Sequence, residues 1–557
     1  MFVALFESAG SITLQPLDDV GALSGERREV APADLARAVR TLETERPRWV
    51  WDDTSRWYPR LLAERVRVDR CVDLRLSHAI LRGSELTAGS RLATAERSSW
   101  DAAAPETVET EEDALFDLSE PDDIEPEDTL AEFALQREAI TGSTDPARLA
   151  LLLAAESAGA LVAAEMFHAG LPWRDDIHDR LLGDLLGPRP APGERPQKLE
   201  ALLDTLRVML ESPDLNPDSP PDLLKALGRA GLMVRSTRSF ELKKLEHPAI
   251  PTLLEYKKLA RLLSANGWHW LDTNVRNGRF HPEYVPGGVV TGRWASKGGG
   301  GALQLPKQVR GAVVADPGWK LVVADASQLE PRILAAMAGD RGMAQAGAAG
   351  DFYAGIVANG AVSTRDQAKV AMLGAMYGAT TGESGRLVPA LKRAYPRAIG
   401  LVETAARAGE RGEIVSTRLG RSSPRPGAAW RETQWEAYGE AATDADASRA
   451  RGQARGWGRF TRNFVVQGTA AEWALCWMAN LRRSLTELGG DRWLTDTAHL
   501  VFFMHDEVVV HCPADAAAEV EEAVRRAAAD AGRLLFGAMP VTFPLTVAIV
   551  DDYGQAK

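Results

Sequence analysis

The chain has 557 residues and a formal net charge of −12 at pH 7. A chain of this length is too long for a single hydrophobic core, so we expect several domains. Its three cysteines, Cys71, Cys476 and Cys512, provide neither a disulfide framework nor metal-ligand spacing, which suits a reducing cytoplasm.

The negative charge is concentrated in one segment. Residues 101–128 contain thirteen Asp or Glu side chains and no Lys or Arg, so the rest of the chain is close to neutral. A near-neutral protein can still bind nucleic acid if its cations line one cleft. We interpret this proline-containing segment as a disordered acidic surface loop, with a partner-binding segment as the alternative.

The first predicted elements are two short strands, Phe2–Phe6 and Trp49–Trp51. The opening residues lack the basic leader of a signal peptide. The apolar run from Leu149 to Phe167 contains two glutamates, Glu156 and Glu165, so we expect a helix in a soluble core and no membrane partner.

Two later segments place carboxylates beside buried strands. The apolar run Leu321–Ala324 ends on Asp325, and the runs on either side of His505-Asp506-Glu507 predict a hairpin with this triplet at its tip. A divalent metal usually compensates carboxylates in such places, although many acidic turns are only solvated. Asp325 and Asp506 could hold two Mg²⁺ ions about 3.5–4 Å apart, the arrangement for in-line phosphoryl transfer.

Between these two segments lies a predicted helix, Arg365–Gly378. Arg365, Lys369, Leu373 and Tyr377 recur at every fourth position and so form one stripe on its surface. The two cations could hold a triphosphate while the apolar and aromatic end stacks on a base. Taken alone, such a stripe is more often a solvated helix face.

Together and in this order, the three segments resemble motifs A, B and C of family A DNA polymerases, the bacterial DNA polymerase I type. Residues 325–332 read Asp-Ala-Ser-Gln-Leu-Glu-Pro-Arg, similar to the family's Asp-Tyr-Ser-Gln-Ile-Glu-Leu-Arg. Residues 365–378 resemble Arg-x3-Lys-x3-Phe-Gly-x2-Tyr-Gly, and residues 505–507 are His-Asp-Glu. Segments 291–296, 417–421 and 459–472 also resemble family segments, so the resemblance covers about residues 150–557.

The resemblance implies an α/β multidomain fold. A right-hand polymerase with palm, fingers and thumb would follow an RNase H-like exonuclease-type domain. The implied boundaries are 1–145 for the exonuclease-like domain, 146–275 for the thumb, 276–340 and 450–557 for the palm, and 341–449 for the fingers.

The implied activity is template-directed addition of dNTPs to a primer 3′ end by two-metal phosphoryl transfer, with two Mg²⁺ ions that Mn²⁺ could replace. The implied partners are primer–template DNA and dNTPs, and the enzyme would be a monomer in the cytoplasm, associated with the nucleoid. Glu330 would be the steric gate against a ribose 2′-hydroxyl and would pair with Tyr377. The remaining roles implied by the resemblance are catalysis by Asp325, Asp506, Glu507 and Lys369; metal binding by Asp325, Asp506 and the Ala326 carbonyl; nucleotide binding by Arg365, Lys369, Leu373, Tyr377, Glu330, Gln328 and His505; and DNA binding by Arg293, Arg459, Asn463 and Gln467.

Several positions depart from the family pattern. Leu373 replaces an aromatic residue under the incoming sugar, and Ala326 replaces the Tyr of motif A. In the N-terminal domain, Phe6-Glu7-Ser8 stands where Asp-x-Glu would begin an exonuclease site. Tyr58 stands in the place of a second acid, and Asp73 is the one acid that matches. We therefore expect a degenerate domain without proofreading.

Two alternatives remain. A single-subunit RNA polymerase would share the palm and fingers, but Glu330 as a gate and the His-Asp-Glu triplet argue against it. A catalytically weak DNA-binding repair scaffold would explain the degenerate exonuclease motifs and Leu373. Against the scaffold, Asp325, Asp506, Arg365 and Lys369 are all present.

Overall fold

The computed structural model describes residues 1–8, 10–103, 126–297, 305–348, 350–379, 381–437, 439 and 442–556. Most of the acidic segment 101–128 lies outside these residues, so its predicted disorder stays a prediction. The chain forms two compact units. Unit 1 contains residues 1–169, 283–295 and 322–548, and unit 2 contains residues 170–282, 296–321 and 549–557.

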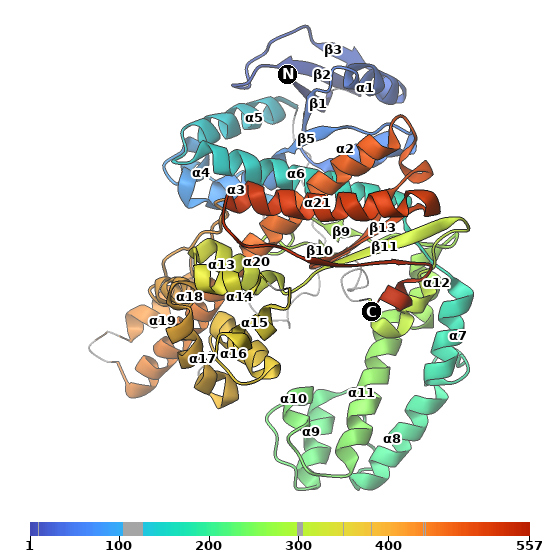
Figure 1. The fold of residues 1–557 in the computed structure, drawn as a ribbon, viewed down its shortest axis with the longest axis vertical. Coiled ribbons are helices and arrows are strands. Elements are labelled where there is room, and N and C mark those ends of the chain that lie inside the picture. Colours follow the sequence, from blue (N-terminus) through green and yellow to red (C-terminus); the bar gives the residue numbers. More distant parts are fainter. Residues whose placement is uncertain are drawn as a thin grey trace. The chain divides into compact units, whose positions relative to one another are not determined.

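Unit 1 is a mixed α/β structure (Figure 1). Its N-terminal elements are β1 (Phe2–Ser8), β2 (Ser11–Leu17), β3 (Arg28–Val30), α1 (Leu35–Glu43), β4 (Arg48–Trp51), α2 (Thr54–Ala63), β5 (Arg70–Asp73), α3 (Leu74–Gly83), α4 (Arg91–Thr94), α5 (Pro126–Thr141) and α6 (Pro146–Ala169). The later elements are β9 (Tyr284–Val285), α13 (Leu329–Ala338), α14 (Arg341–Ala346), α15 (Phe352–Ala358), α16 (Arg365–Tyr377), α17 (Gly382–Ala394), α18 (Pro396–Glu410), α19 (Ala428–Glu436), α20 (Asp444–Gly489), β12 (His499–Met504), β13 (Glu507–Pro513) and α21 (Ala517–Phe536).

The N-terminal sheet has the strand order β3-β2-β1-β4-β5. The pairs β1/β2 and β2/β3 are antiparallel, whereas β1/β4 and β4/β5 are parallel. Both predicted strands are therefore confirmed, as β1 and β4. Val3 and Leu5 pack with α1, α2 and α6, and Ala4 and Phe6 pack with α3 and α5. Because both faces of β1 are covered, its sequence is a continuous apolar run and does not alternate.

Helix α6 belongs to unit 1 and packs against α2, β5 and α20. It is long and apolar enough to cross a membrane, but 72% of its most apolar window is buried inside the protein. The helix lies in the same compact unit as the N-terminal sheet. The predicted domain boundaries, including the assignment of this helix to the thumb, stay predictions.

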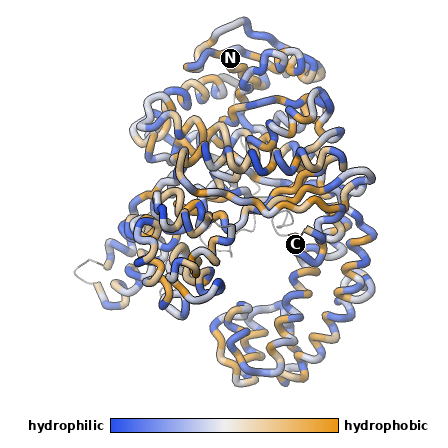
Figure 2. Tube along the Cα trace, viewed as in Figure 1, coloured by the Kyte–Doolittle hydropathy of each residue, from blue (hydrophilic) through white to orange (hydrophobic). Residues whose placement is uncertain are grey.

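A second sheet has the order β12-β13-β11-β14, with β11 (Trp319–Ala326) and β14 (Leu545–Val550) reaching the boundary of the unit. Apolar residues run along its strands (Figure 2). Strands β12 and β13 form the predicted antiparallel hairpin, with Met504 opposite Glu507. The predicted strand before Asp325 is longer than expected and continues through Asp325 to Ala326, because the Ala326 amide still makes a backbone hydrogen bond to Asp506, directly before β13.

Two helices of unit 1 have well-defined ends. The predicted helix from Arg365 is confirmed as α16, since the Thr364 hydroxyl accepts a hydrogen bond from the Gln367 amide and Gly378 ends the helix at a φ of 74°. Helix α20 is 46 residues long and begins with a capping box formed by Thr443 and Asp446.

Unit 2 is mainly helical, and α8 and α11 lie side by side in it (Figure 1). Its elements are β6 (Leu171–Pro172), α7 (Asp175–Leu186), α8 (Gln197–Met209), α9 (Pro220–Arg229), α10 (Ser239–Leu242), α11 (Ala249–Asn266), α12 (Trp268–Asn274), β7 (Val275–Arg276) and β8 (Arg279–Phe280). A two-residue strand, β10 (Ala295–Ser296), pairs with β9.

Candidate active site

Asp325 lies on β11 and Asp506 lies in the turn between β12 and β13, so the two residues are far apart in the sequence. Strand β11 pairs with β13, and the Ala326 amide donates a 2.8 Å hydrogen bond to the Asp506 carbonyl. Both side chains are half-buried. The backbone pairing therefore places the two predicted metal ligands next to each other at the end of the sheet.

The hairpin tip that carries Asp506 has an unusual backbone. The Asp506 amide donates a 2.8 Å hydrogen bond to the Met504 carbonyl, which closes a three-residue γ-turn around His505. His505 has a φ of 60°, a conformation that non-glycine residues rarely adopt. Strain of this kind persists where the surrounding structure holds it, and such positions cluster at functional sites.

The donor set at this site suits a hard divalent cation. In the described part of the chain, no group of three or more His, Cys, Asp or Glu side chains is placed to hold a metal on its own. Asp325, Asp506 and the Ala326 carbonyl supply oxygen ligands only. Mg²⁺ is commonly bound by one or two carboxylates together with substrate phosphates and water, so these residues fit it. Glu507 begins β13 and is only 1% exposed, so its side chain lies inside the unit.

The predicted stripe lies on the exposed side of α16. Arg365, Lys369 and Tyr377 are exposed and Leu373 is half-buried. The opposite side packs in the core through small or apolar residues, namely Ala368, Ala371, Met372, Gly374 and Ala375. The stripe is therefore available to a ligand in solution.

Arg365 is held in place by its neighbours. Its Nε donates to Asp351 Oδ2 at 2.7 Å, and its guanidinium lies 5.7 Å from the Tyr353 ring centroid. The hydrogen bond to Asp351 raises the pKa of Arg365. Lys369 forms no ion pair with any residue that the structure describes. One of the two predicted phosphate-binding cations is thus held by neighbouring side chains, and the other is exposed to solvent.

Glu330, the predicted gate, is the centre of a hydrogen-bonded network. The Tyr377 hydroxyl donates to Glu330 Oε2 at 2.9 Å, which is the pairing expected from the sequence. Arg293 donates to Glu330 Oε1 at 2.6 Å. Gln467 donates to the Tyr377 hydroxyl at 3.3 Å. The network joins the first turn of α13, the last turn of α16 and the middle of α20.

His505 and Gln328 differ in their surroundings. His505 lies at the hairpin tip, where partial burial of its ring and the nearby Arg293 charge lower its pKa. Gln328, predicted to bind nucleotide, already uses both ends of its side chain. Its Nε2 donates to Asp351 at 3.1 Å and its Oε1 accepts from the Phe352 amide at 2.9 Å.

Asp351 has a role that the sequence analysis missed. It accepts hydrogen bonds from Arg365 and Gln328 and also caps α15 through the Tyr353 amide. An aspartate directly before a short helix was the available signal, and it predicts only the cap.

The residues predicted to contact DNA on α20 form part of a longer row. Arg459 is exposed, and Asn463 and Gln467 are half-buried. Arg451 and Arg455 continue the same spacing toward the N-terminus, and both are exposed. None of the three arginines forms an ion pair within the described ranges. Spacing by four residues from Arg459 could have identified the two additional cations from the sequence.

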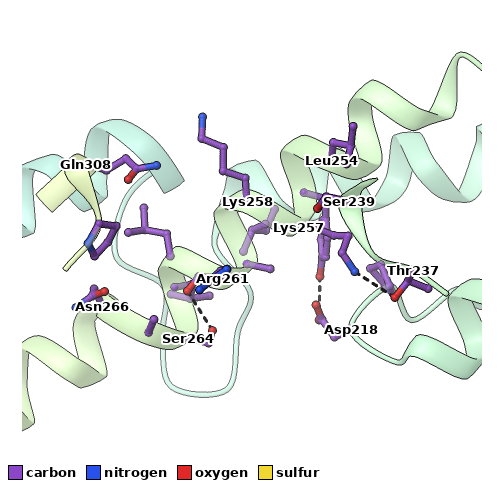
Figure 3. Close-up of a pocket in the computed structure, with 18 of the residues that line it drawn as sticks. Asp218, Thr237, Ser239, Leu254, Lys257, Lys258, Arg261, Ser264, Asn266 and Gln308 are labelled. Carbon is purple, nitrogen blue, oxygen red and sulfur yellow. Dashed lines mark hydrogen bonds between the residues drawn. The ribbon is translucent and has the colours of Figure 1, made fainter. Parts of the chain in front are cut away.

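Unit 2 contains a basic pocket of about 1000 Å³. Its cationic lining comes from Arg195, Lys257, Lys258 and Arg261, with Lys257 and Lys258 on α11 (Figure 3). Partial burial lowers the pKa of Lys257, whose Nζ donates to the Thr237 hydroxyl at 3.4 Å. The pocket therefore brings four cationic side chains together in unit 2.

Arginines pair with the carboxylates of the N-terminal sheet, where the sequence predicts a degenerate exonuclease site. Glu7 on β1 accepts hydrogen bonds from Arg56 at 2.6 Å and Arg60 at 3.3 Å. Asp52 is buried and accepts from Arg56 and the Trp57 indole. These carboxylates are neutralised by neighbouring side chains.

Asp73 and Tyr58 are also engaged inside the protein. Asp73 is 2% exposed and accepts from the backbone amides of Thr54 and Leu76. Burial and then the nearby Asp53 charge raise the pKa of Asp73 to about 7. Tyr58 is buried and donates to Glu165 at 2.6 Å.

The chain is similar to known DNA polymerases. The family described as DNA polymerase family A matches residues 197–550. A thermostable DNA polymerase I of Thermus filiformis is 27% identical over 359 residues, which are 58% of this chain and 38% of that protein. A DNA polymerase I of Chloroflexus aurantiacus is 29% identical over 333 residues, 54% of this chain and 32% of that protein. The chain thus spans less than half the length of these relatives.

Among solved structures, the POL domain of Pol1 from M. smegmatis, in complex with DNA primer-template and dNTP, is similar over the whole chain. The TM-score is 0.70 with 18% sequence identity, and the match covers 100% of this chain and 95% of that one. This likeness shows a shared fold, including the N-terminal mixed sheet.

Proposed function

This chain belongs to DNA polymerase family A, and from that premise we propose that it is a template-directed DNA polymerase. It would add deoxynucleotides to the 3′ end of a primer by phosphoryl transfer with two divalent metal ions. The observation that carries the proposal is the backbone hydrogen bond from the Ala326 amide to the Asp506 carbonyl, which brings Asp325 and Asp506 together at one end of the sheet.

Asp325, Asp506 and the Ala326 carbonyl would hold Mg²⁺, with Mn²⁺ as a substitute. When bound, such ions activate the primer hydroxyl and neutralise charge that develops on the phosphates. The protein contributes by keeping the two carboxylates adjacent and half-buried. The hydrogen-bonded sheet does this without any cost of ordering at the moment of reaction.

Arg365 and Lys369 would bind the triphosphate of the incoming dNTP. Arg365 is rigidly placed by Asp351 and Tyr353, and its planar guanidinium can give two parallel hydrogen bonds to phosphate oxygens. Lys369 has freedom to follow the β- and γ-phosphates. Leu373 and Tyr377, further along the same stripe, would contact the sugar and base.

Glu330 would exclude ribonucleotides. A carboxylate held by Tyr377 on one oxygen and by Arg293 on the other cannot easily rotate away from a 2′-hydroxyl. This arrangement favours the DNA polymerase over the RNA polymerase alternative.

The DNA would lie against three groups of cations and amides. Arg293 and Gln467 meet at the Glu330–Tyr377 pair, so they are placed to contact the nascent base pair. Arg459, with Arg451 and Arg455, would bind backbone phosphates along α20. In unit 2, the pocket with Lys257 and Lys258 would contact the duplex product.

We further propose that the N-terminal domain is RNase H-like and does not proofread. The support for the fold is the strand order, in which three antiparallel strands are followed by two parallel ones. Two observations support inactivity. Arg56 and Arg60 donate hydrogen bonds to the Glu7 carboxylate, and Asp73 is a buried residue that caps a helix. A labelled single strand with Mg²⁺ should remain intact; shortening that is abolished by Asp73→Asn would contradict this.

Primer extension tests the main proposal. A primed template is incubated with Mg²⁺ and either dNTPs or rNTPs, and Asp506→Asn is compared with the parent protein. We expect extension with dNTPs, weak extension with rNTPs, and none in the variant. Glu522→Gln changes an exposed glutamate on α21 and should leave extension unchanged. Intact DNA binding without extension by the parent would favour the scaffold alternative.

A further inference from the structure

The turn Thr417–Arg421 lies between α18 and α19 and has no role in the mechanism described above. Its ends are closed by a bridge between Ser416 and Ser422, and the Thr417 amide donates to the Arg421 carbonyl at 2.9 Å. Thr417, Leu419 and Arg421 are all buried. A buried turn must have its backbone groups satisfied by other parts of the fold, and those partners indicate what it connects.

One set of partners comes from the N-terminal domain. The Ser84 hydroxyl donates to the Gly420 carbonyl at 2.7 Å, and the Glu85 amide donates to the Ser422 hydroxyl at 2.9 Å. Gly420 has a φ of 107°, and a Cβ there would lie 2.5 Å from the Leu86 side chain. The N-terminal domain therefore contacts the turn closely, and the φ of Gly420 favours glycine at this position.

A second set comes from α20, beside Gln467. The Leu419 amide donates to Glu472 at 2.9 Å and the Arg418 amide donates to the Thr469 hydroxyl at 3.0 Å. A Cβ on Gly468 would lie 2.5 Å from the methyl group of Thr417. The turn is thus packed directly against the residue that follows Gln467.

A buried ion pair makes the third connection. Arg421 donates to Glu156 on α6 at 2.9 Å, and the two residues are 9% and 1% exposed. A Cβ on Gly292 would lie 2.6 Å from Arg421 Nε, and the φ of Gly292 is 82°. The guanidinium therefore fills the space beside Gly292, the residue directly before Arg293.

We propose that Arg421 and Glu156 are positioning residues that hold the backbone at Gly292 and so place Arg293 on Glu330. The same turn places Gln467 through Gly468. The N-terminal domain, which lacks a free exonuclease site, would act in polymerisation by fixing this turn. This inference rests on the proposed function only where activity is concerned.

The chemistry of the pair supports a geometric role. A buried ion pair adds little net stability, because its desolvation offsets the attraction between the charges. Replacement of both partners by apolar residues of similar size is often neutral, whereas removal of one leaves an uncompensated buried charge. The pair can therefore be tested in a form that preserves stability.

The first experiment measures hydrogen exchange by mass spectrometry and does not depend on activity. In Glu156→Gln and in the double variant Glu156→Leu/Arg421→Met, exchange in residues 287–296 should be at least about tenfold faster than in the parent. Glu165→Gln is the matched control, since Glu165 is also on α6 and is bound by Arg482 at 2.8 Å. Unchanged exchange in the double variant would overturn the proposal.

The second experiment measures single-nucleotide insertion. A displacement of Arg293 should lower kcat/KM for a correct dNTP by about 10- to 100-fold in the double variant, at an unfolding midpoint close to that of the parent. Discrimination against a mismatched primer end should fall as well. In the single variant Arg421→Lys, which keeps the positive charge, both kcat/KM and this discrimination should be higher than in the double variant. A double variant that extends primers like the parent would refute the positioning role. A parent that does not extend primers would refute the proposed function, and hydrogen exchange would still decide whether the pair holds the turn.

Discussion

Glu472 on α20 leads to a prediction with an unusual sign. It is 1% exposed and accepts hydrogen bonds from the Leu419 amide and the Thr417 hydroxyl. Burial raises its pKa to about 7 from 4.5, and these hydrogen bonds oppose the rise only in part. Because the folded protein holds this proton more tightly than the unfolded chain, stability should fall as pH rises from 4.5 to 7.

The magnitude follows from the two pKa values. A folded-state pKa of about 7 against 4.5 corresponds to about 3 kcal/mol, reached once the pH exceeds 7. Glu472→Gln cannot ionise, and its amide can still accept from Leu419 and donate to Thr417. The variant should therefore match the parent near pH 5 and be more stable than the parent, by up to about 3 kcal/mol, at pH 8.

Urea unfolding at pH 5, 6, 7 and 8 measures this difference. Subtraction of the parent from the variant at each pH cancels every other titrating group, including Asp73. Glu522→Gln, on the exposed side of α21, should follow the parent at all four values. A difference between Glu472→Gln and the parent that does not change with pH would refute the reasoning, because it would mean that Glu472 titrates alike in both states.

Two further predictions concern nucleotide and DNA contacts. Tyr377→Phe removes the hydroxyl that restrains Glu330. The kinetic preference for dNTP over rNTP should therefore fall by about tenfold, which corresponds to the loss of one hydrogen bond to a charged group. An unchanged preference would mean that Arg293 alone is enough to hold the carboxylate. Replacement of Arg451 and Arg455 by Ala should reduce the dependence of log K on log salt by about 2, from two lost phosphate contacts. Arg449→Ala, whose guanidinium is paired with Asp446, is the control, and an equal reduction there would indicate only a general charge effect.

Local sequence patterns predicted the elements that carry the site. Apolar runs predicted β1, β4, β11 and the hairpin of β12 and β13, and the spacing by four residues predicted α16 with its exposed stripe. These predictions held because each depends on a periodicity that the backbone imposes within one segment. The end of β11 was misplaced, because strand length depends on a pairing partner that is distant in the sequence.

By itself, the sequence determined the fold family, the order of the three motifs and the candidate side chains of the site. The tertiary structure alone decided how these side chains are used. It placed Asp325 beside Asp506, engaged Gln328 with Asp351, and paired Glu7 on β1 with Arg56. It also showed that the turn before Ser422 connects the N-terminal domain to α20. The physical reason is that hydrogen bonds and ion pairs between distant segments depend on packing, which no local pattern encodes.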